Sequence, residues 1–226
     1  MKKINLGCGP IGRDDWINLD WGILAFIHSF PLIEKLFYKM DFISAGYKTK
    51  WPKNLKLYDC RRKLPFVFNS VDFIYASHFL EHLKKFEAER VLKECFRVLK
   101  KGGVLRIIVP DLKKILFRYI EKDSKFFLDS VGPEERQKLG GLAIADLLNM
   151  MFYPEFYRVK LSGISRLAAF FIRPHMWMYD FESLSRLLKG FGFKAIEERE
   201  FRQGEVPDLD VLDLFPEMSL YVEAKK

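Results

Sequence analysis

The N-terminal segment joins a glycine turn to a carboxylate, two features that together suit nucleoside binding. The apolar strand Lys3-Ile4-Asn5-Leu6 leads into Gly7-Cys8-Gly9, and the short strand Ile17-Asn18-Leu19 leads into Asp20. Glycine lacks Cβ and tolerates positive φ, so the backbone of such a turn can approach a ligand closely. A carboxylate at the tip of the next strand can accept two hydrogen bonds from a ribose diol. The pattern predicts a nucleoside site at the edge of a parallel sheet; the structural alternative is a tight turn with a surface aspartate.

The spacing of this motif argues against two common nucleotide sites. Asp20 follows Gly9 after eleven positions, whereas a dinucleotide site places its acidic residue about 20 residues beyond the glycines. The connection has room for no more than one helical turn, because a parallel crossover needs about a dozen residues. No Lys-Ser or Lys-Thr pair follows the glycines, which excludes a P-loop.

A second group of reactive side chains follows a predicted strand at 71–76. His78 and Glu81 come soon after it, and His82 and His175 are further candidates. A histidine can take a proton from a hydroxyl group and a carboxylate can orient the histidine, so His78, Glu81 and His175 are the candidate catalytic residues. Each histidine has a structural or surface role as its alternative. No His, Cys and Asp residues show metal-ligand spacing, so no bound metal is expected.

Periodicity and turn residues predict alternating strands and helices. The clearest unit is a strand at 71–76, a helix at 86–100 ended by Gly102-Gly103, and a strand at 104–109. Such a unit with short joins is a right-handed parallel crossover. Asp180 is expected to cap a helix that Gly190 ends. Further strands are expected at 55–59, 194–201 and 219–224. The fold class is therefore α/β, with a doubly wound, Rossmann-like sheet in a single domain spanning residues 1–226.

The composition is that of a globular protein with a basic surface. Lys+Arg 38 against Asp+Glu 30 gives a net charge of +8, which would aid approach to nucleic acid, phosphorylated sugars or an acidic membrane surface. Cys8, Cys60 and Cys95 form no C-x-x-C pair and no disulfide framework, which fits a reducing cytosol. No signal peptide and no apolar run of about 18 residues is seen, so a cytoplasmic location is expected.

Two aromatic segments, 21–53 and 112–174, fall outside the sheet pattern and interleave aromatic residues with Lys and Arg. We expect them to be helical inserts that form a lid on the acceptor side, with plain packing helices as the alternative. The segment 166–173 is short and has an arginine at each end. It would form an interfacial helix, giving peripheral contact with the inner face of a membrane.

Together the motifs resemble class I S-adenosylmethionine-dependent methyltransferases, in particular the type 11-like group. Arg97-Val98-Leu99-Lys100-Lys101-Gly102-Gly103 is similar to that family's RVLKPGG, with Lys101 in place of proline. His175-Met176-Trp177-Met178-Tyr179-Asp180 is similar to a bacterial subgroup placed among sugar and polysaccharide enzymes. The other segments that carry the resemblance are Asn5-Leu6-Gly7-Cys8-Gly9-Pro10, Asn18-Leu19-Asp20, Asp59, Leu64-Pro65-Phe66 and the run from Asp72 to His82.

The resemblance implies a seven-stranded sheet whose last strand is antiparallel, and S-adenosylmethionine as the cofactor. The glycine turn would approach the methionine part, and Asp20 would bind the ribose hydroxyls. Asp59 and Cys60 would lie near the adenine amino group, while Ser77 and His78 would border the methionine tail and the acceptor. The cofactor-binding residues implied in this way are Asn5, Gly7, Cys8, Gly9, Asp20, Asp59, Cys60, Ser77 and His78.

The expected function is therefore O-methylation of a sugar, glycan or other small molecule. One alternative is an RNA methyltransferase, and the other is a non-catalytic, methyltransferase-like binding module. The RNA reading rests on a basic run formed by Lys48, Lys50, Lys53, Lys56, Arg61, Arg62 and Lys63.

Overall fold

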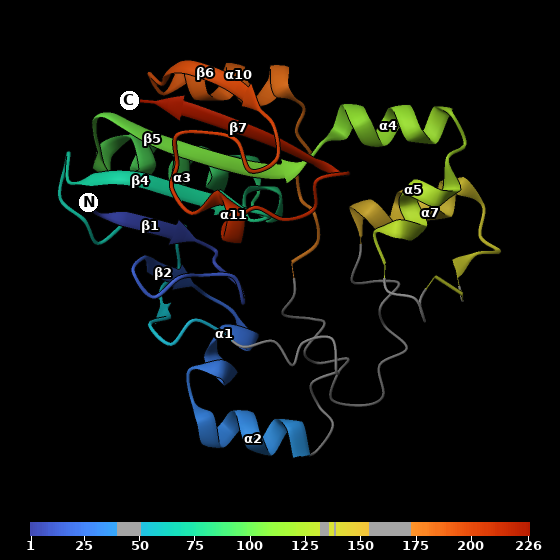
Figure 1. Cartoon of the computed structure of the whole chain (residues 1–226), viewed down its shortest axis with the longest axis horizontal. Coiled ribbons are helices and arrows are strands. Elements are labelled where there is room, and N and C mark those ends of the chain that lie inside the picture. The colour runs from blue at the N-terminus through green and yellow to red at the C-terminus, as the bar shows by residue number, and fades with distance from the viewer. Residues whose placement is uncertain (40–50, 132–135, 138, 154–172) are drawn as a thin grey trace.

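The computed structural model describes residues 1–39, 51–131, 136–137, 139–153 and 173–226. These residues build a seven-stranded sheet with the order β3-β2-β1-β4-β5-β7-β6 (Figure 1). The strands are β1 (Lys3–Leu6), β2 (Ile17–Asp20), β3 (Lys56–Leu57), β4 (Val71–Ser77), β5 (Leu99–Pro110), β6 (Lys194–Arg199) and β7 (Ser219–Lys225).

The strand directions confirm the predicted α/β class and the antiparallel final strand. The pairs β3–β2, β2–β1, β1–β4 and β4–β5 are parallel, whereas β7 is antiparallel to both β5 and β6. Strand β3 has two residues rather than the predicted five, since only Lys56 and Leu57 pair with β2. The sheet extends from β1 toward β2 on one side and toward β4 on the other. The order of the strands therefore reverses between β1 and β4.

Helix α3 (Lys85–Val98) forms the crossover from β4 to β5. The carboxylate of Glu87 accepts a 2.9 Å hydrogen bond from the backbone amide of Lys84, which fixes the start of the helix. The helix ends at Val98, two residues earlier than predicted, because Leu99 is already extended and begins β5. Its buried positions recur at spacings of three and four, as a helix with one apolar face requires: Ala88, Val91, Leu92 and Cys95.

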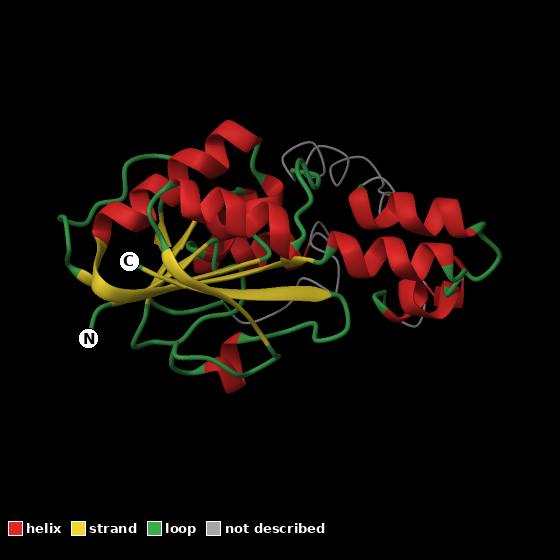
Figure 2. Cartoon of the chain, turned by 90° about the horizontal axis from the view of Figure 1, so that it is seen from above, coloured by secondary structure: helices red, strands yellow, loops and turns green. Residues whose placement is uncertain are grey.

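The two faces of the sheet are covered differently. Helices α3 and α10 (Phe181–Gly190) pack on one face, where they share a core with alternate residues of β1, β4, β5 and β7. Asp180 caps α10, as predicted, by accepting a 2.8 Å hydrogen bond from the amide of Ser183. Loops and the short helix α11 (Leu209–Leu212) cover the other face, around Trp16 and Tyr75. Figure 2 shows the long helices on one side of the strands and a short helix on the other.

A helical lobe lies beyond the ends of β5 and β7 (Figure 1). It consists of α4 (Leu112–Ile120), α5 (Ser124–Asp129) and α7 (Ile144–Phe152). The lobe has a small core of its own, built from Ile115, Phe127, Leu147 and Met151. It contains the described part of the second predicted insert, since most of residues 154–174 lie outside the described ranges.

The first predicted insert includes two helices after β2, α1 (Ile23–His28) and α2 (Pro31–Lys39). Both lie below β2 in Figure 1, away from the lobe. No helix in the described part of the chain is long and apolar enough to cross a membrane. The predicted interfacial helix at 166–173 falls almost wholly outside the described residues.

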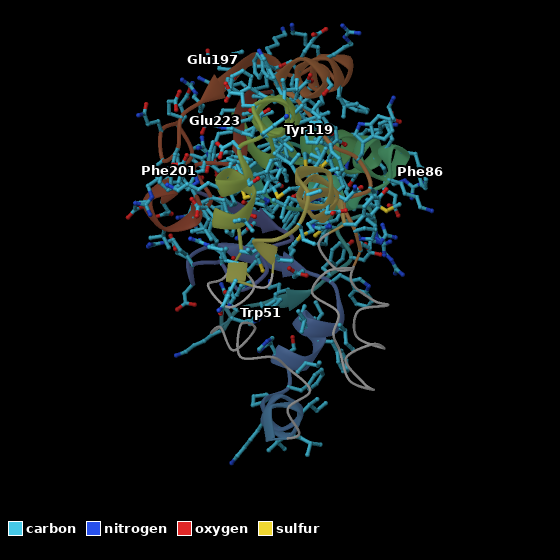
Figure 3. All side chains as sticks on the ribbon, turned by 90° about the vertical axis from the view of Figure 1, so that its right-hand side faces the viewer. Trp51, Phe86, Tyr119, Glu197, Phe201 and Glu223 are labelled. Atoms are coloured by element: carbon cyan, nitrogen blue, oxygen red, sulfur yellow. The ribbon has the colours of Figure 1, made fainter. Side chains whose placement is uncertain are left out.

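A buried ion network fastens β5 to the C-terminal segment. The Arg106 guanidinium is fully buried and donates to Asp213 at 2.5 and 3.1 Å and to Glu223 at 3.1 Å. Figure 3 shows Glu223 within the packed side chains of the sheet, whereas Glu197 on the neighbouring strand lies at the surface. Two carboxylates around one guanidinium satisfy charges that would be costly to bury alone.

A short helical turn, η2 (Leu80–His82), connects β4 to α3. It carries Glu81 and His82, and it follows directly on the carboxyl end of β4. The fold therefore presents this turn at the same edge of the sheet as the glycine turn after β1.

Candidate functional site

The carboxyl ends of β1, β2 and β4 lie at one edge of the sheet, because these strands are parallel neighbours. The strand order reverses between β1 and β4, and open α/β sheets bind ligands in the crevice outside such a reversal. Gly7 follows β1, Asp20 ends β2 and His78 follows β4. The topology thus gathers the two groups of residues singled out in the sequence.

The glycine turn is tied to the carboxylate at the end of β2. Gly7 and Gly9 have φ of 61° and 50°, the left-handed region that favours glycine. The amide of Gly9 donates a 2.6 Å hydrogen bond to Oδ2 of Asp20, and the amide of Cys8 donates to the carbonyl of Leu19 at 3.1 Å. Burial raises the pKa of Asp20 above its ordinary value, although backbone hydrogen bonds from Gly9 and Trp21 oppose the rise.

The two glycines face different surroundings. A Cβ at Gly9 would meet no atom within 4 Å, so the backbone there borders open space. A Cβ at Gly7 would lie 2.5 Å from Cδ2 of Phe79. The Phe79 ring therefore covers Gly7 and leaves Gly9 beside Asp20 as the accessible part of the turn.

Asn5 and Asn18 hold the loop that follows the glycine turn. Asn5 Nδ2 donates to the carbonyl of Ile11 at 2.8 Å, and Asn18 Nδ2 donates to the carbonyl of Arg13 at 2.9 Å. Both side chains are almost fully buried. Asn5 was expected among the cofactor-binding residues, and its side chain is directed at this loop. Its amide thus fixes the shape of the turn.

The cysteines at this edge are buried thiols. Burial raises the pKa of Cys60 to about 12 and also raises that of Cys8 above its ordinary value. Cys60 also interacts with the backbone of Gly7, so the loop after β3 reaches the glycine turn. Cys8, Cys60 and Cys95 are all free. Thiols that stay protonated do not act as nucleophiles, so these side chains fill space.

Asp59 is bound to a neighbouring arginine. Arg61 donates to both of its carboxylate oxygens, at 2.7 and 2.8 Å. Burial alone would raise the pKa of Asp59, but the Arg61 guanidinium outweighs it and lowers the pKa. Arg61 also reaches Glu87 at 3.3 Å, and Glu87 accepts a 2.6 Å hydrogen bond from Arg173. These ion pairs connect the loop after β3 to α3 and to the segment that precedes α10.

His78 stands at the end of β4 between a carboxylate and a hydroxyl. Its Nδ1 lies 3.2 Å from Oε1 of Glu81, and its Nε2 lies 3.1 Å from Oγ of Ser219. The residue has a φ of 48°, which is uncommon for a side chain other than glycine and often marks a functional position. Its ring also meets the edge of Phe215, with the centroids 5.1 Å apart.

Glu81 lies among three histidines. Its carboxylate is fully buried, and burial would raise its pKa, but His78, His82 and His175 outweigh that effect and lower it. The rings of His82 and His175 have centroids 4.9 Å apart. Burial lowers the pKa of His175 to about 4, so this imidazole is neutral at pH 7. The structure thus brings the three predicted catalytic residues together.

The Ser77 hydroxyl interacts with the hydroxyl of Tyr75. Tyr75 belongs to the core on the face of the sheet that α11 covers. The sequence interpretation missed Phe79, Phe215 and Ser219. Ser219 had an available signal, because an antiparallel final strand begins where its parallel neighbours end, and Ser219 pairs with Pro110 at the end of β5. Phe79 carried no such signal, since an aromatic residue after a strand is an ordinary core residue.

A cavity of about 470 Å³ lies between the helical lobe and the segment before β7. Phe215, the ring that touches His78, forms part of its wall. Residues of α4 and α5, the residues that flank α5 and the segment before β7 form the rest, namely Arg118, Asp123, Lys125, Phe126, Asp129, Ser130, Pro216, Glu217 and Met218. The cavity is of a size that accommodates a small organic ligand.

This strand order, with the candidate binding residues at the reversal, is that of a Rossmann-like methyltransferase fold. Residues 43–107 match the model of the methyltransferase domain, a stretch that includes β4 and α3 but not the glycine turn. The match, on this fold, supports an S-adenosylmethionine-dependent methyltransferase with S-adenosylmethionine as its cofactor.

Solved structures of methyltransferases are similar over the whole chain. An S-adenosylmethionine-dependent methyltransferase from Archaeoglobus fulgidus has 15% identity and a TM-score of 0.48, over 100% of this chain and 86% of that one. One from Mesorhizobium loti has 18% identity and a TM-score of 0.47, over 100% of this chain and 90% of that one. One from Methanosarcina mazei has 15% identity and a TM-score of 0.47, over 100% of this chain and 92% of that one. No curated protein matches the sequence.

Proposed function

We propose that this protein transfers the methyl group of S-adenosylmethionine to a hydroxyl of a sugar, glycan or other small molecule. The observation that carries the proposal is the hydrogen bond between the Gly9 amide and Asp20 at the reversal of the strand order. The backbone at Gly9, which no side chain covers, lies beside the Asp20 carboxylate. An uncovered glycine backbone next to a carboxylate is the combination that binds a nucleoside.

The residues at this edge fit S-adenosylmethionine. The backbone around Gly9 borders open space, and the Asp20 carboxylate beside it is the acceptor for the ribose hydroxyls. Cys60 contacts the glycine turn from the loop after β3, so this loop borders the same site, and Asp59 within it is the proposed partner of the adenine. Phe79, over Gly7, supplies an apolar wall for the methionine side. When bound, the cofactor supplies an electrophilic methyl group on a sulfonium.

His78 is proposed as the base that takes the proton of the acceptor hydroxyl. The 3.2 Å contact with Glu81 places a hydrogen on Nδ1 and leaves the lone pair on Nε2, which faces Ser219. An acceptor hydroxyl that replaces Ser219 as the partner of Nε2 would give up its proton there as the new O–CH₃ bond forms. Because Glu81 fixes the tautomer of His78, and His175 packs against Glu81, these two residues act through His78.

The cavity beside Phe215 is the proposed acceptor site. Carboxylates and cationic groups along its wall match the hydroxyls of a sugar, and Phe126 and Phe215 offer faces for the C–H surface of a ring. An RNA acceptor is less well supported, because Arg61 of the basic run is already paired with Asp59 and Glu87. Lys48 and Lys50 of that run lie outside the described residues.

The direct test is a transfer assay with S-adenosylmethionine labelled in its methyl group. Purified protein is incubated with a panel of nucleotide sugars and oligosaccharides, and in parallel with total RNA. Label in a sugar fraction, released as an O-methyl sugar on hydrolysis, is the expected result. Label in RNA alone would replace the sugar proposal with the RNA reading. Tight cofactor binding with no turnover on any acceptor would favour the non-catalytic module.

A further inference from the structure

Glu81, His82 and His175 form a compact cluster beside the proposed catalytic histidine. They come from two segments more than ninety positions apart, the η2 turn and the stretch that leads into α10. One ligand atom from each lies within 4.8 Å of the other two. The sequence predicted no metal because no such spacing exists along the chain. We propose that these three side chains bind a divalent transition-metal ion, and that Zn²⁺ suits the set best.

Glu81 and His175 carry buried polar atoms without a hydrogen-bond partner. Both carboxylate oxygens of Glu81 are buried and have no hydrogen-bond partner among the described residues, although Oε1 lies 3.2 Å from Nδ1 of His78. Nδ1 of His175 is buried and likewise unpartnered within the described ranges. A buried polar atom without a partner costs free energy, so such atoms in a folded protein point to an absent ligand.

The third residue is held in the manner of a metal-bound histidine. Nδ1 of His82 lies 2.8 Å from the carbonyl of Arg173 and 3.2 Å from that of Pro174. Carbonyls only accept hydrogen bonds, so the hydrogen is on Nδ1 and the lone pair is on Nε2. Metal-binding histidines usually donate their second nitrogen to a carbonyl or carboxylate, which fixes ring orientation.

The backbone around the cluster is fixed independently of any ion. The amides of Met176 and Trp177 donate to the carbonyl of Glu81 at 2.7 and 3.2 Å. This anchors the segment of His175 to the η2 turn. Ligands of a tetrahedral zinc ion lie about 3.3 Å apart, given Zn–N bonds near 2.0 Å. The present spacing of up to 4.8 Å would therefore shorten by about 1.5 Å when an ion binds.

The donor set selects the class of ion. Two imidazoles and one carboxylate suit Zn²⁺ and its first-row neighbours, whereas Mg²⁺ and Ca²⁺ prefer oxygen ligands. The charge is also appropriate, because the Glu81 carboxylate is fully buried and a divalent cation beside it would balance its negative charge. The competing explanation is a protein-only cluster in which His78 or His82 carries the positive charge that Glu81 needs.

The ion would act as a cross-link rather than as the reacting centre. It would join the end of β4 to the segment that leads into α10. Through Glu81, whose other oxygen contacts His78, it would also fix the orientation of the proposed base. This inference deepens the proposed function, but metal binding is measured without any methyl acceptor. If the protein binds no metal, the proposed methyl transfer can still be tested, and if it transfers no methyl group, metal binding can still be tested.

The test is zinc binding by the full chain after removal of metals with a chelator. Calorimetric titration with Zn²⁺ and metal analysis after gel filtration give the stoichiometry, and Co²⁺ in place of Zn²⁺ reports coordination through its visible absorption. We expect one ion per chain and a rise in the unfolding temperature with Zn²⁺. The variants His82→Ala, His175→Ala and Glu81→Gln should bind at least about 100-fold more weakly, and His28→Ala, a histidine outside the cluster, should bind normally.

Two outcomes would overturn the proposal. One is the absence of stoichiometric Zn²⁺ or Co²⁺ binding by the wild-type chain, which would favour the protein-only cluster. The other is equal binding by wild type, His28→Ala and all three cluster variants, which would place the ion elsewhere. If a cluster variant unfolds without metal, circular dichroism of the wild type with and without Zn²⁺ decides, because a bound cross-link must raise its melting temperature.

Discussion

The backbone amide of Gly9 and the carboxylate of Asp20 are joined by a 2.6 Å hydrogen bond across neighbouring strands. The contact fixes the glycine turn after β1 against the end of β2. It also keeps the half-buried Asp20 carboxylate beside open space, because a Cβ at Gly9 would meet no atom within 4 Å. This is the feature on which the proposed binding of S-adenosylmethionine depends.

Gly7→Ala should be more damaging than Gly9→Ala. Both positions have positive φ, so each alanine carries about 1–2 kcal/mol of backbone strain. Only the Cβ at Gly7 also collides with a ring, 2.5 Å from Phe79. Urea unfolding of the two variants measures the difference. The double variant Gly7→Ala with Phe79→Ala should show less than the sum of the single losses. Strict additivity would show that the ring does not fill the space over Gly7.

Much of the fold could be predicted from local patterns. The strand–helix–strand unit around α3 and the Asp180 cap follow from spacings within a few residues, and the structure confirms them. The number of strands and the antiparallel last strand came from the family resemblance, whereas the order of the strands was not predicted. The contact of Glu81 with His175 could not be predicted from the neighbouring sequence, because it depends on how the segment before α10 packs against the turn after β4.

Arg106→Met should strongly destabilise the fold. The substitution leaves the buried carboxylates of Asp213 and Glu223 without their guanidinium. Removing one partner of a buried ion pair costs about 3–5 kcal/mol. The matched control is Arg186→Met, which breaks an exposed pair with Glu182 and should cost less than about 0.5 kcal/mol. Similar urea midpoints for both variants would contradict a stabilising role for the network.

Stability should decrease in acid partly through Glu94. The Arg97 guanidinium donates to both of its carboxylate oxygens, at 2.7 and 2.8 Å, and lowers its pKa from 4.5. An acid with a lowered pKa stabilises the fold above its unfolded pKa and loses that contribution as the pH falls through the folded value. Glu94→Gln should therefore be less stable than wild type at pH 7, and the gap should narrow below about pH 4.5. Urea unfolding across pH 3–7 checks this, and a gap independent of pH would refute it.

His78→Ala should slow methyl transfer without weakening cofactor binding. A positioned general base contributes about 10²–10⁴ to the rate, so kcat should fall by that range. The affinity for S-adenosylmethionine should stay within about twofold, since the residue acts on the acceptor. The variant Ser219→Ala tests the geometry. It removes the present partner of Nε2 and should leave the base in place, so a much smaller loss is expected. If kcat falls equally in His78→Ala and Ser219→Ala, Ser219 itself has a role in the reaction.

The central claim is that Asp20 and the glycine turn bind S-adenosylmethionine, and calorimetry on three proteins tests it most directly. Asp20→Ala should weaken binding by about 1–3 kcal/mol, the usual loss for a charged hydrogen-bond partner. Asp14→Ala, an exposed carboxylate in the following loop, should bind like wild type, and NAD should not displace the cofactor from any of the three. Equal affinity in wild type and Asp20→Ala, or no binding of S-adenosylmethionine by wild type, would contradict the account.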